Sequence, residues 1–134
     1  MVAEEIVARH LRALGRRGNI VLNGLQSRYG DIDHLVFQKD GRVVMIETKS
    51  HVGTVTSDGD RLLINGRPLP VNPLCQIHCN IRWLRRKLKQ GGRQRVWCVA
   101  VLALPYATVK VRRPFKRVIV LGSRQIDQLS RLLR

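Results

Sequence analysis

The 134-residue chain has few acidic residues, few aromatic residues and no long apolar run. No apolar stretch approaches the ~18–20 residues of a membrane-spanning helix, so we do not expect the chain to cross a membrane. The three cysteines are an odd number with no evident pairing, which argues against a disulfide scaffold. Residues 1–5 include two acids, where a secretory signal would have a basic and then an apolar stretch. We therefore expect a cytoplasmic protein.

The composition that remains is that of one folded domain with a large surplus of positive charge. Hydrophobic residues make up 44% of the chain and charged residues 25%, which is ordinary for a globular domain. The length fits a single domain over residues 1–134. Lys and Arg number 25 against nine Asp and Glu, for a formal net charge of +16. A field of this sign attracts polyanions, and nucleic acid is the foremost polyanion of a cell.

The charge is unevenly distributed along the chain. Eight of the nine acids lie in the first sixty positions, whereas residues 61–126 contain no acid and fifteen Lys or Arg. A solubilising surface is the alternative, but mixed signs would serve that purpose better. Aromatic residues are only 4%, so contact with phosphates is favoured over stacking on bases. We expect DNA, with RNA as an alternative, to contact the basic residues Arg82, Arg85, Arg86, Lys89, Arg112, Arg113, Lys116 and Arg117.

Apolar periodicity and turn residues predict an alternation of helices and strands. Helices are predicted over 4–14, from the Asn72-Pro73 cap to about 89, and over 124–133. Strands are predicted over 20–22, 32–37, 43–48, 54–56, 62–64, 96–104 and 118–121. Two of these strands are apolar on both faces, so helices should cover the sheet on each side. The prediction is an α/β sandwich with a mixed central sheet flanked by helices.

The two strongest strands meet in a hairpin whose register has two alternatives. A two-residue Asp40-Gly41 loop would place Asp33 opposite Thr48. A three-residue loop over 39–41 needs positive φ at its last position, where Gly41 stands, and would place Asp33 opposite Glu47.

The three-residue loop would also place Asp31 opposite Lys49, on the same face as the other two acids. Two carboxylates opposed at about 5 Å repel by ~3 kcal/mol at an effective dielectric near 20. A divalent cation would reverse that sign, and Mg²⁺ is typically held by one or two carboxylates, water and substrate oxygens. The alternative is that these acids form surface salt bridges with the surplus arginines.

These residues resemble a known nuclease signature. Gly30-Asp-Ile-Asp-His34, a hairpin and Ile46-Glu-Thr-Lys49 resemble the PD-(D/E)xK motif of restriction-endonuclease-like folds, without the usual proline before the acid. The wider pattern resembles the nuclease-related domain (NERD) family. It adds an opening helix with Glu4, then Gly53-Thr-Val, then Asn72-Pro-Leu-Cys-Gln76, and extends from Glu4 to about Leu104.

The resemblance implies an αβββαβ core and metal-dependent hydrolysis of DNA phosphodiester bonds. It makes Asp33 and Glu47 ligands of Mg²⁺ or Mn²⁺, with the Thr48 carbonyl as a further ligand and Lys49 as the catalytic lysine. It also implies that Glu4 reaches a second metal or a bound water, and that Gln76 orients Lys49 or a phosphate. A two-fold dimer would suit cleavage of both strands. The alternative function is a non-catalytic, basic nucleic-acid-binding module with the same fold.

Several other polar residues are assigned structural roles. Cys75, His78 and Cys79 lie on one predicted helix face, but they have no partner motif elsewhere, and packing is favoured over a zinc site. We expect His34 and His51, which flank the proposed site, to make structural hydrogen bonds.

Overall fold

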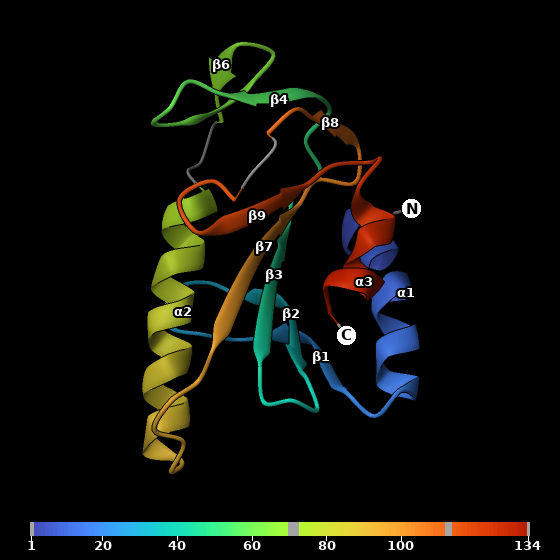
Figure 1. Cartoon of the computed structure of the whole chain (residues 1–134). Helices are drawn as coiled ribbons and strands as arrows, with labels where there is room; N and C mark the ends of the chain where they lie inside the picture. The colour runs from blue at the N-terminus through green and yellow to red at the C-terminus, as the bar shows by residue number, and fades with distance from the viewer. Residues whose placement is uncertain (1, 70–72, 112–113, 134) are drawn as a thin grey trace.

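The computed structural model describes residues 2–69, 73–111 and 114–133, and its centre is a five-stranded mixed sheet (Figure 1). In spatial order the strands are β1 (Ile20–Leu25), β2 (Ile32–Phe37), β3 (Val43–Thr48), β7 (Cys98–Ala103) and β9 (Val118–Leu121). The first three are antiparallel neighbours, whereas β3, β7 and β9 run parallel. The predicted mixed sheet is confirmed.

Two helices, α1 (Ala3–Arg16) and α2 (Pro73–Gln90), cover opposite faces of this sheet (Figure 1). On α1, buried apolar residues recur every three or four positions and face one cluster of the core; they are Val7, Leu11 and Leu14. On α2, the corresponding stripe faces the other cluster; it consists of Leu74, Ile77, Ile81 and Leu84. Burying such a side chain stabilises the fold by about 1.5–3 kcal/mol. The order α1, β1, β2, β3, α2, β7 is the expected αβββαβ core.

A second, four-stranded sheet extends the core and was not anticipated from the sequence. Its strands, in spatial order, are β6 (Arg67–Pro68), β5 (Leu62–Ile64), β4 (Gly53–Ser57) and β8 (Ala107–Val109). Only β4 and β5 correspond to predicted strands. β8 is three residues long and pairs in parallel with β4, which is distant in the sequence. No local pattern marks such a strand.

The predicted helix over 124–133 is confirmed only in part. The chain forms a 3₁₀ turn, η1 (Ile126–Gln128), followed by the short helix α3 (Leu129–Leu132) on the α1 side of the sheet. The 3₁₀ turn and α3 have no side-chain cap, and the Ser123 N–H before them donates to the carbonyl of Ala107 at 2.8 Å. The Gln125 side chain accepts from the Gly122 N–H at 2.9 Å. These bonds hold the segment in a turn, so the helix begins late.

The β2–β3 hairpin has the register of the three-residue loop. His34 lies opposite Ile46, and the Gln38 N–H donates to the Arg42 carbonyl at 2.9 Å. Gly41 closes the loop with φ +92°, a conformation that L side chains rarely adopt. The two-residue alternative is therefore excluded.

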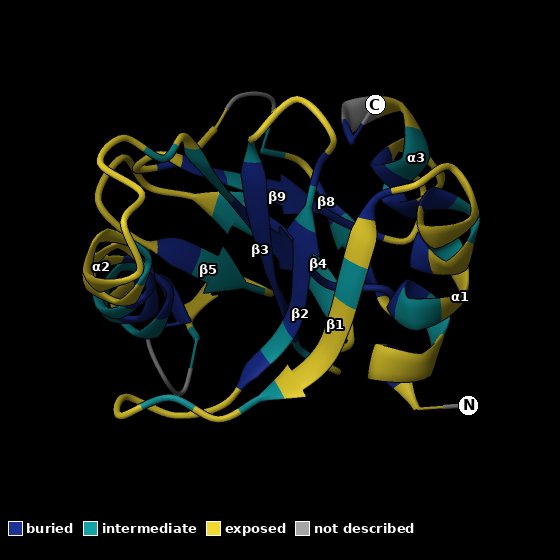
Figure 2. Ribbon diagram, turned by 90° about the horizontal axis from the view of Figure 1, so that it is seen from below, coloured by how far each residue is buried: buried dark blue, intermediate teal, exposed yellow. Residues whose placement is uncertain are grey.

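Burial is deepest along β3, where all six residues are buried (Figure 2). β1 is an edge strand and is mostly exposed (Figure 2). Across the described segments, no helix combines the length and the apolar character needed to span a bilayer.

Candidate active site

Three polar side chains meet where β2 begins and β3 ends. The carboxyls of Asp33 and Glu47 are hydrogen-bonded to each other. The Lys49 Nζ lies 3.5 Å from the Glu47 Oε1. The Asp33 Oδ2 also accepts the Thr48 N–H at 2.7 Å, which ties β2 to the end of β3. Asp33, Glu47 and Lys49, which the sequence analysis assigned to one site, are therefore neighbours in the structure.

Glu47 is the electrostatic centre of this group. Only 4% of the residue is exposed. Burial, reinforced by the charge of Asp33, raises the pKa of Glu47 to about 8, and Lys49 only partly opposes this rise. Burial disfavours a charged carboxylate because water no longer solvates it. A further positive charge beside Glu47 would therefore stabilise its ionised form.

A third acid approaches from α1. The negative charge of Asp33, followed by partial burial and the charge of Asp31, raises the pKa of Glu4, while Lys49 lowers it. Glu4 itself is exposed in the first turn of the helix. Its charge is therefore coupled to that of Asp33, while its expected role at a second metal or a bound water stays a prediction.

The loop that leads into β2 is anchored to α2, a feature that the sequence analysis missed. The Ser27 hydroxyl contacts the Gly30 carbonyl at 2.6 Å and the Asn80 Oδ1 at 2.5 Å. It also accepts the Tyr29 N–H at 3.0 Å. Asn80 is fully buried. No sequence signal marks this contact, because Ser27 and Asn80 are 53 positions apart.

Gln76 lies against the same loop. A Cβ added at Gly30, where φ is +102°, would come within 2.8 Å of the Gln76 Nε2. The side chain thus packs on the segment that carries Asp31 and Asp33. This location fits a positioning role, while the expected orientation of Lys49 by Gln76 remains a prediction.

The donor set suits a hard divalent cation. The adjacent carboxyl groups of Asp33 and Glu47 form the kind of oxygen-rich site that Mg²⁺ and Mn²⁺ prefer, and Mg²⁺ takes its remaining ligands from water and substrate. Within the described segments, no three His, Cys, Asp or Glu side chains form a ready metal-binding group. The residues therefore fit an ion held by the carboxyl pair together with other oxygens.

Other polar residues near the site are placed differently. His34 is buried, and its Nδ1 is 2.8 Å from the Asn23 Oδ1, in line with the expected structural hydrogen bond. Burial lowers the pKa of His34. Asp31 is exposed, and the ion pair of Lys49 is with Glu47.

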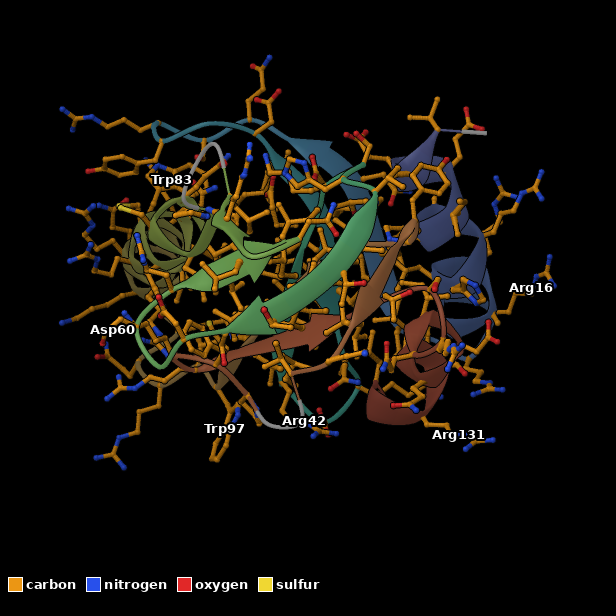
Figure 3. The ribbon with its side chains drawn as sticks, turned by 90° about the horizontal axis from the view of Figure 1, so that it is seen from above. Arg16, Arg42, Asp60, Trp83, Trp97 and Arg131 are labelled. Atoms are coloured by element: carbon orange, nitrogen blue, oxygen red, sulfur yellow. The ribbon has the colours of Figure 1, made fainter. Side chains whose placement is uncertain are left out.

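The predicted nucleic-acid-binding residues lie mainly on the exposed side of α2. Arg82, Arg85, Arg86 and Lys89 are all exposed there, and the side-chain view shows charged groups projecting around the whole molecule (Figure 3). Lys116 and Arg117 are exposed, and Lys116 shares a cavity with the first turn of α2. The remaining two candidates, Arg112 and Arg113, lie outside the described residues.

The cysteines are free thiols. Cys75 is exposed, while Cys79 and Cys98 are partly buried. Burial raises the pKa of the Cys98 thiol.

Two comparisons with known proteins bear on identity. The family model described as the nuclease-related domain matches residues 1–105. This range contains the acids, the lysine and the α2 anchor described above. The search of curated proteins finds no match. With a family model matched over more than half of its length, the chain belongs to the nuclease-related domain (NERD) family.

Proposed function

We propose that this protein is a Mg²⁺- or Mn²⁺-dependent nuclease that hydrolyses DNA phosphodiester bonds at the Asp33–Glu47–Lys49 site. One observation carries the proposal. A buried glutamate is forced against a second carboxyl, with a lysine 3.5 Å away, at the end of a rigid central strand. A fold that needed only stability would gain nothing from burying a glutamate whose charged form is disfavoured in this way. Membership of the nuclease-related domain family supports the same reading.

Each residue has a distinct task in this proposal. Asp33 and Glu47, with the Thr48 carbonyl, would hold the cation, and Glu4 would reach a second ion or a bound water. When bound, such an ion polarises the phosphate and lowers the pKa of the attacking water. Lys49 is partly exposed and can turn its ammonium from Glu47 toward the phosphate, where it stabilises developing negative charge. Gln76 lies against Gly30 in the loop that precedes β2 and would orient Lys49 or a phosphate.

The basic face of α2 would bind the DNA backbone. The arginines and Lys89 lie outside the acidic group and are exposed, so they can neutralise phosphates without neutralising the site. Binding through phosphates releases counterions, and affinity should fall steeply as salt rises. A two-fold dimer would bring two such sites to the two strands of a duplex.

A non-catalytic nucleic-acid-binding module is the second candidate. It is favoured by the Lys49–Glu47 ion pair, which partly satisfies the site from within. It is also favoured by the lack of a ready three-residue metal group in the described segments.

Plasmid and linear DNA cleavage with Mg²⁺ or Mn²⁺ separates the two candidates. We expect cleavage by the native protein and its loss in Asp33→Asn and Lys49→Ala. Asp40→Asn is the matched control, because Asp40 lies in the loop at the opposite end of the same hairpin. The nuclease proposal fails if neither cation supports cleavage, or if the two site variants cut as well as the control. Equal DNA binding by all variants without cleavage would establish the binding module.

A further inference from the structure

A positively charged cavity lies between α2 and the loop that precedes β2. It has a volume of about 540 Å³ and is lined by Tyr29, Cys79, Arg82, Arg85 and Arg86. We call it the Tyr–Arg pocket. Its size is within the range of small-ligand sites. Among the described residues no acid lines it, so its positive charge is available to an anion from solution.

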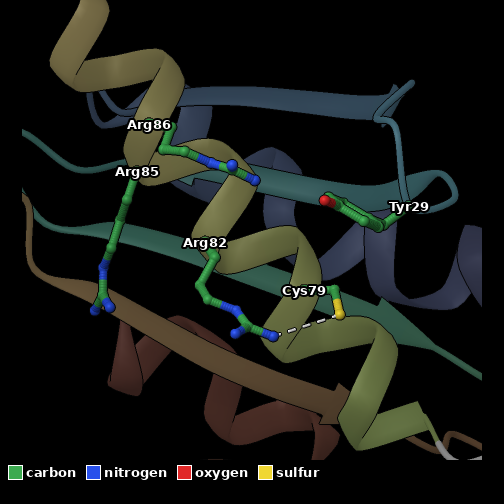
Figure 4. Close-up of a pocket in the computed structure, with 5 residues that line it drawn as sticks. All are labelled: Tyr29, Cys79, Arg82, Arg85 and Arg86. Atoms are coloured by element: carbon green, nitrogen blue, oxygen red, sulfur yellow. Dashed lines mark hydrogen bonds between the residues drawn. The ribbon is translucent and has the colours of Figure 1, made fainter.

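The side chains of the Tyr–Arg pocket divide into two groups (Figure 4). Arg86 extends toward Tyr29, and Arg82 bends back toward Cys79, whose Sγ it contacts at 3.7 Å. Arg85 points away, toward β7 (Figure 4), where its charge partly opposes the rise that burial causes in the pKa of the Cys98 thiol. Two guanidinium groups and one aromatic ring therefore surround the opening.

The position of Tyr29 is fixed by its loop. Its N–H donates to the Ser27 hydroxyl at 3.0 Å, and that hydroxyl is held by Asn80 of α2. Tyr29 is nevertheless 41% exposed, so its side chain is accessible from solution. A tyrosine held in place beside exposed guanidinium groups is preorganised to contact a planar group from solution.

The chemistry of the Tyr–Arg pocket matches a nucleotide. Guanidinium groups bind phosphate oxygens in a bidentate manner, and aromatic rings stack on bases regardless of sequence. Bases within a continuous duplex are already stacked on their neighbours and cannot stack on Tyr29. Only an unpaired nucleotide presents both groups.

The pocket is also close to the candidate active site. Tyr29 precedes Asp33 by four residues, so the two Cα atoms are separated by at most about 14 Å. That distance corresponds to about four steps of a stacked strand at 3.4 Å each. A strand whose phosphate lies at Asp33 and Glu47 therefore reaches the Tyr–Arg pocket within a few nucleotides.

We propose that the Tyr–Arg pocket binds an unpaired nucleotide, with its base on Tyr29 and its phosphate on Arg82 and Arg86, so that the substrate is DNA with a single-stranded segment beside the cleaved bond. The link to cleavage rests on the proposed nuclease function. The binding itself does not. A single conspicuous aromatic residue thus gives a mostly phosphate-binding surface a preference for DNA structure.

The test measures DNA binding in EDTA, where no cleavage occurs. Fluorescence anisotropy compares a labelled blunt duplex with a duplex that carries a single-stranded overhang. We expect the native protein to bind the overhang substrate more tightly. Tyr29→Leu should weaken that binding about tenfold, equivalent to about 1.4 kcal/mol, and leave blunt-duplex binding unchanged. Tyr29→Phe should retain native affinity, because the ring remains.

The controls address charge and folding. Tyr106→Leu removes an exposed tyrosine from the β7–β8 turn and should change nothing. Arg82→Ala or Arg86→Ala should each reduce the salt slope of overhang binding by about 0.7, whereas Arg12→Ala, on the opposite side of the sheet in α1, should not. Thermal melting verifies that each variant is folded.

Three results would overturn the proposal. Equal affinity for blunt and overhang substrates would show that no unpaired nucleotide is recognised. Equal losses in Tyr29→Phe and Tyr29→Leu would show that the hydroxyl, rather than the ring, makes the contact. If Tyr29→Leu loses overhang binding and the native protein cuts no DNA, the Tyr–Arg pocket is upheld and the nuclease proposal is refuted. If the native protein cuts DNA and Tyr29→Leu binds the overhang substrate as tightly as the native protein, the nuclease proposal stands and the Tyr–Arg pocket proposal is refuted.

Discussion

Replacing Glu47 with glutamine should stabilise the metal-free protein at pH 8 and have little effect at pH 5. The pKa of Glu47 is raised by burial and by Asp33 to about 8, against 4.5 in an unfolded chain. The folded state therefore binds this proton more tightly than the unfolded state. The stability that it contributes is present in full below pH 4.5 and is lost as the pH rises toward 8.

The magnitude follows from the same linkage. At 1.36 kcal/mol per pH unit, a native carboxyl with this pKa loses on the order of 3 kcal/mol of unfolding free energy between pH 5 and pH 8. Glu47→Gln keeps the shape of the side chain and removes the titration. The variant should therefore exceed the native protein in stability at pH 8 by about that amount.

Urea denaturation in EDTA at the two pH values measures the effect. With an m-value of about 1–3 kcal/mol per molar urea, the midpoints should differ by about 1 M or more at pH 8. Glu5→Gln is the matched control, since Glu5 is exposed in the first turn of α1 and its replacement raises the net charge equally. The reasoning is refuted if Glu47→Gln gains no stability at pH 8, or if Glu5→Gln gains as much.

Three further predictions concern the hairpin, the loop anchor and the lysine. Gly41→Ala should cost about 1–2 kcal/mol of unfolding free energy, because Gly41 has φ +92°; Gly91→Ala, at ordinary φ, should cost nothing measurable by the same denaturation. Ser27→Ala should cost about 1–3 kcal/mol, because buried Asn80 loses its partner; an undiminished melting temperature would contradict this. Lys49→Ala should slow single-turnover cleavage by about 10²–10³-fold with little change in DNA affinity; weakened binding with unchanged cleavage would argue against the assigned role.

The grouping of Asp33 with Glu47 could be predicted from the sequence, because it depends only on the loop and the two strands of one hairpin. Gly41 is the residue that the three-residue loop requires, and that loop sets the register that joins Asp33 to Glu47. The period of two along each strand then fixes which side chains share a face. The apolar residues of α1 and α2 recur at helical spacing within each segment, and the two helices predicted from them are confirmed.

The features that the sequence did not reveal depend on contacts between distant segments. β8 exists through its pairing with β4, and the Ser27–Asn80 contact joins residues 53 positions apart. The late start of α3 depends on the Ser123 N–H donating to Ala107 of β8. In each case tertiary hydrogen bonds override or replace local propensity, and periodicity carries no record of them.

The wholly buried β3 has a consequence for how members of this family can diversify. β3 is hydrogen-bonded to β2 on one side and to β7 on the other, so its backbone cannot shift without disturbing the whole interior. Glu47 lies on this buried central strand, whereas Tyr29 and the α2 arginines lie on the exposed surface. Surface side chains can therefore be exchanged, with a change in what the surface binds, while the position of Glu47 stays the same.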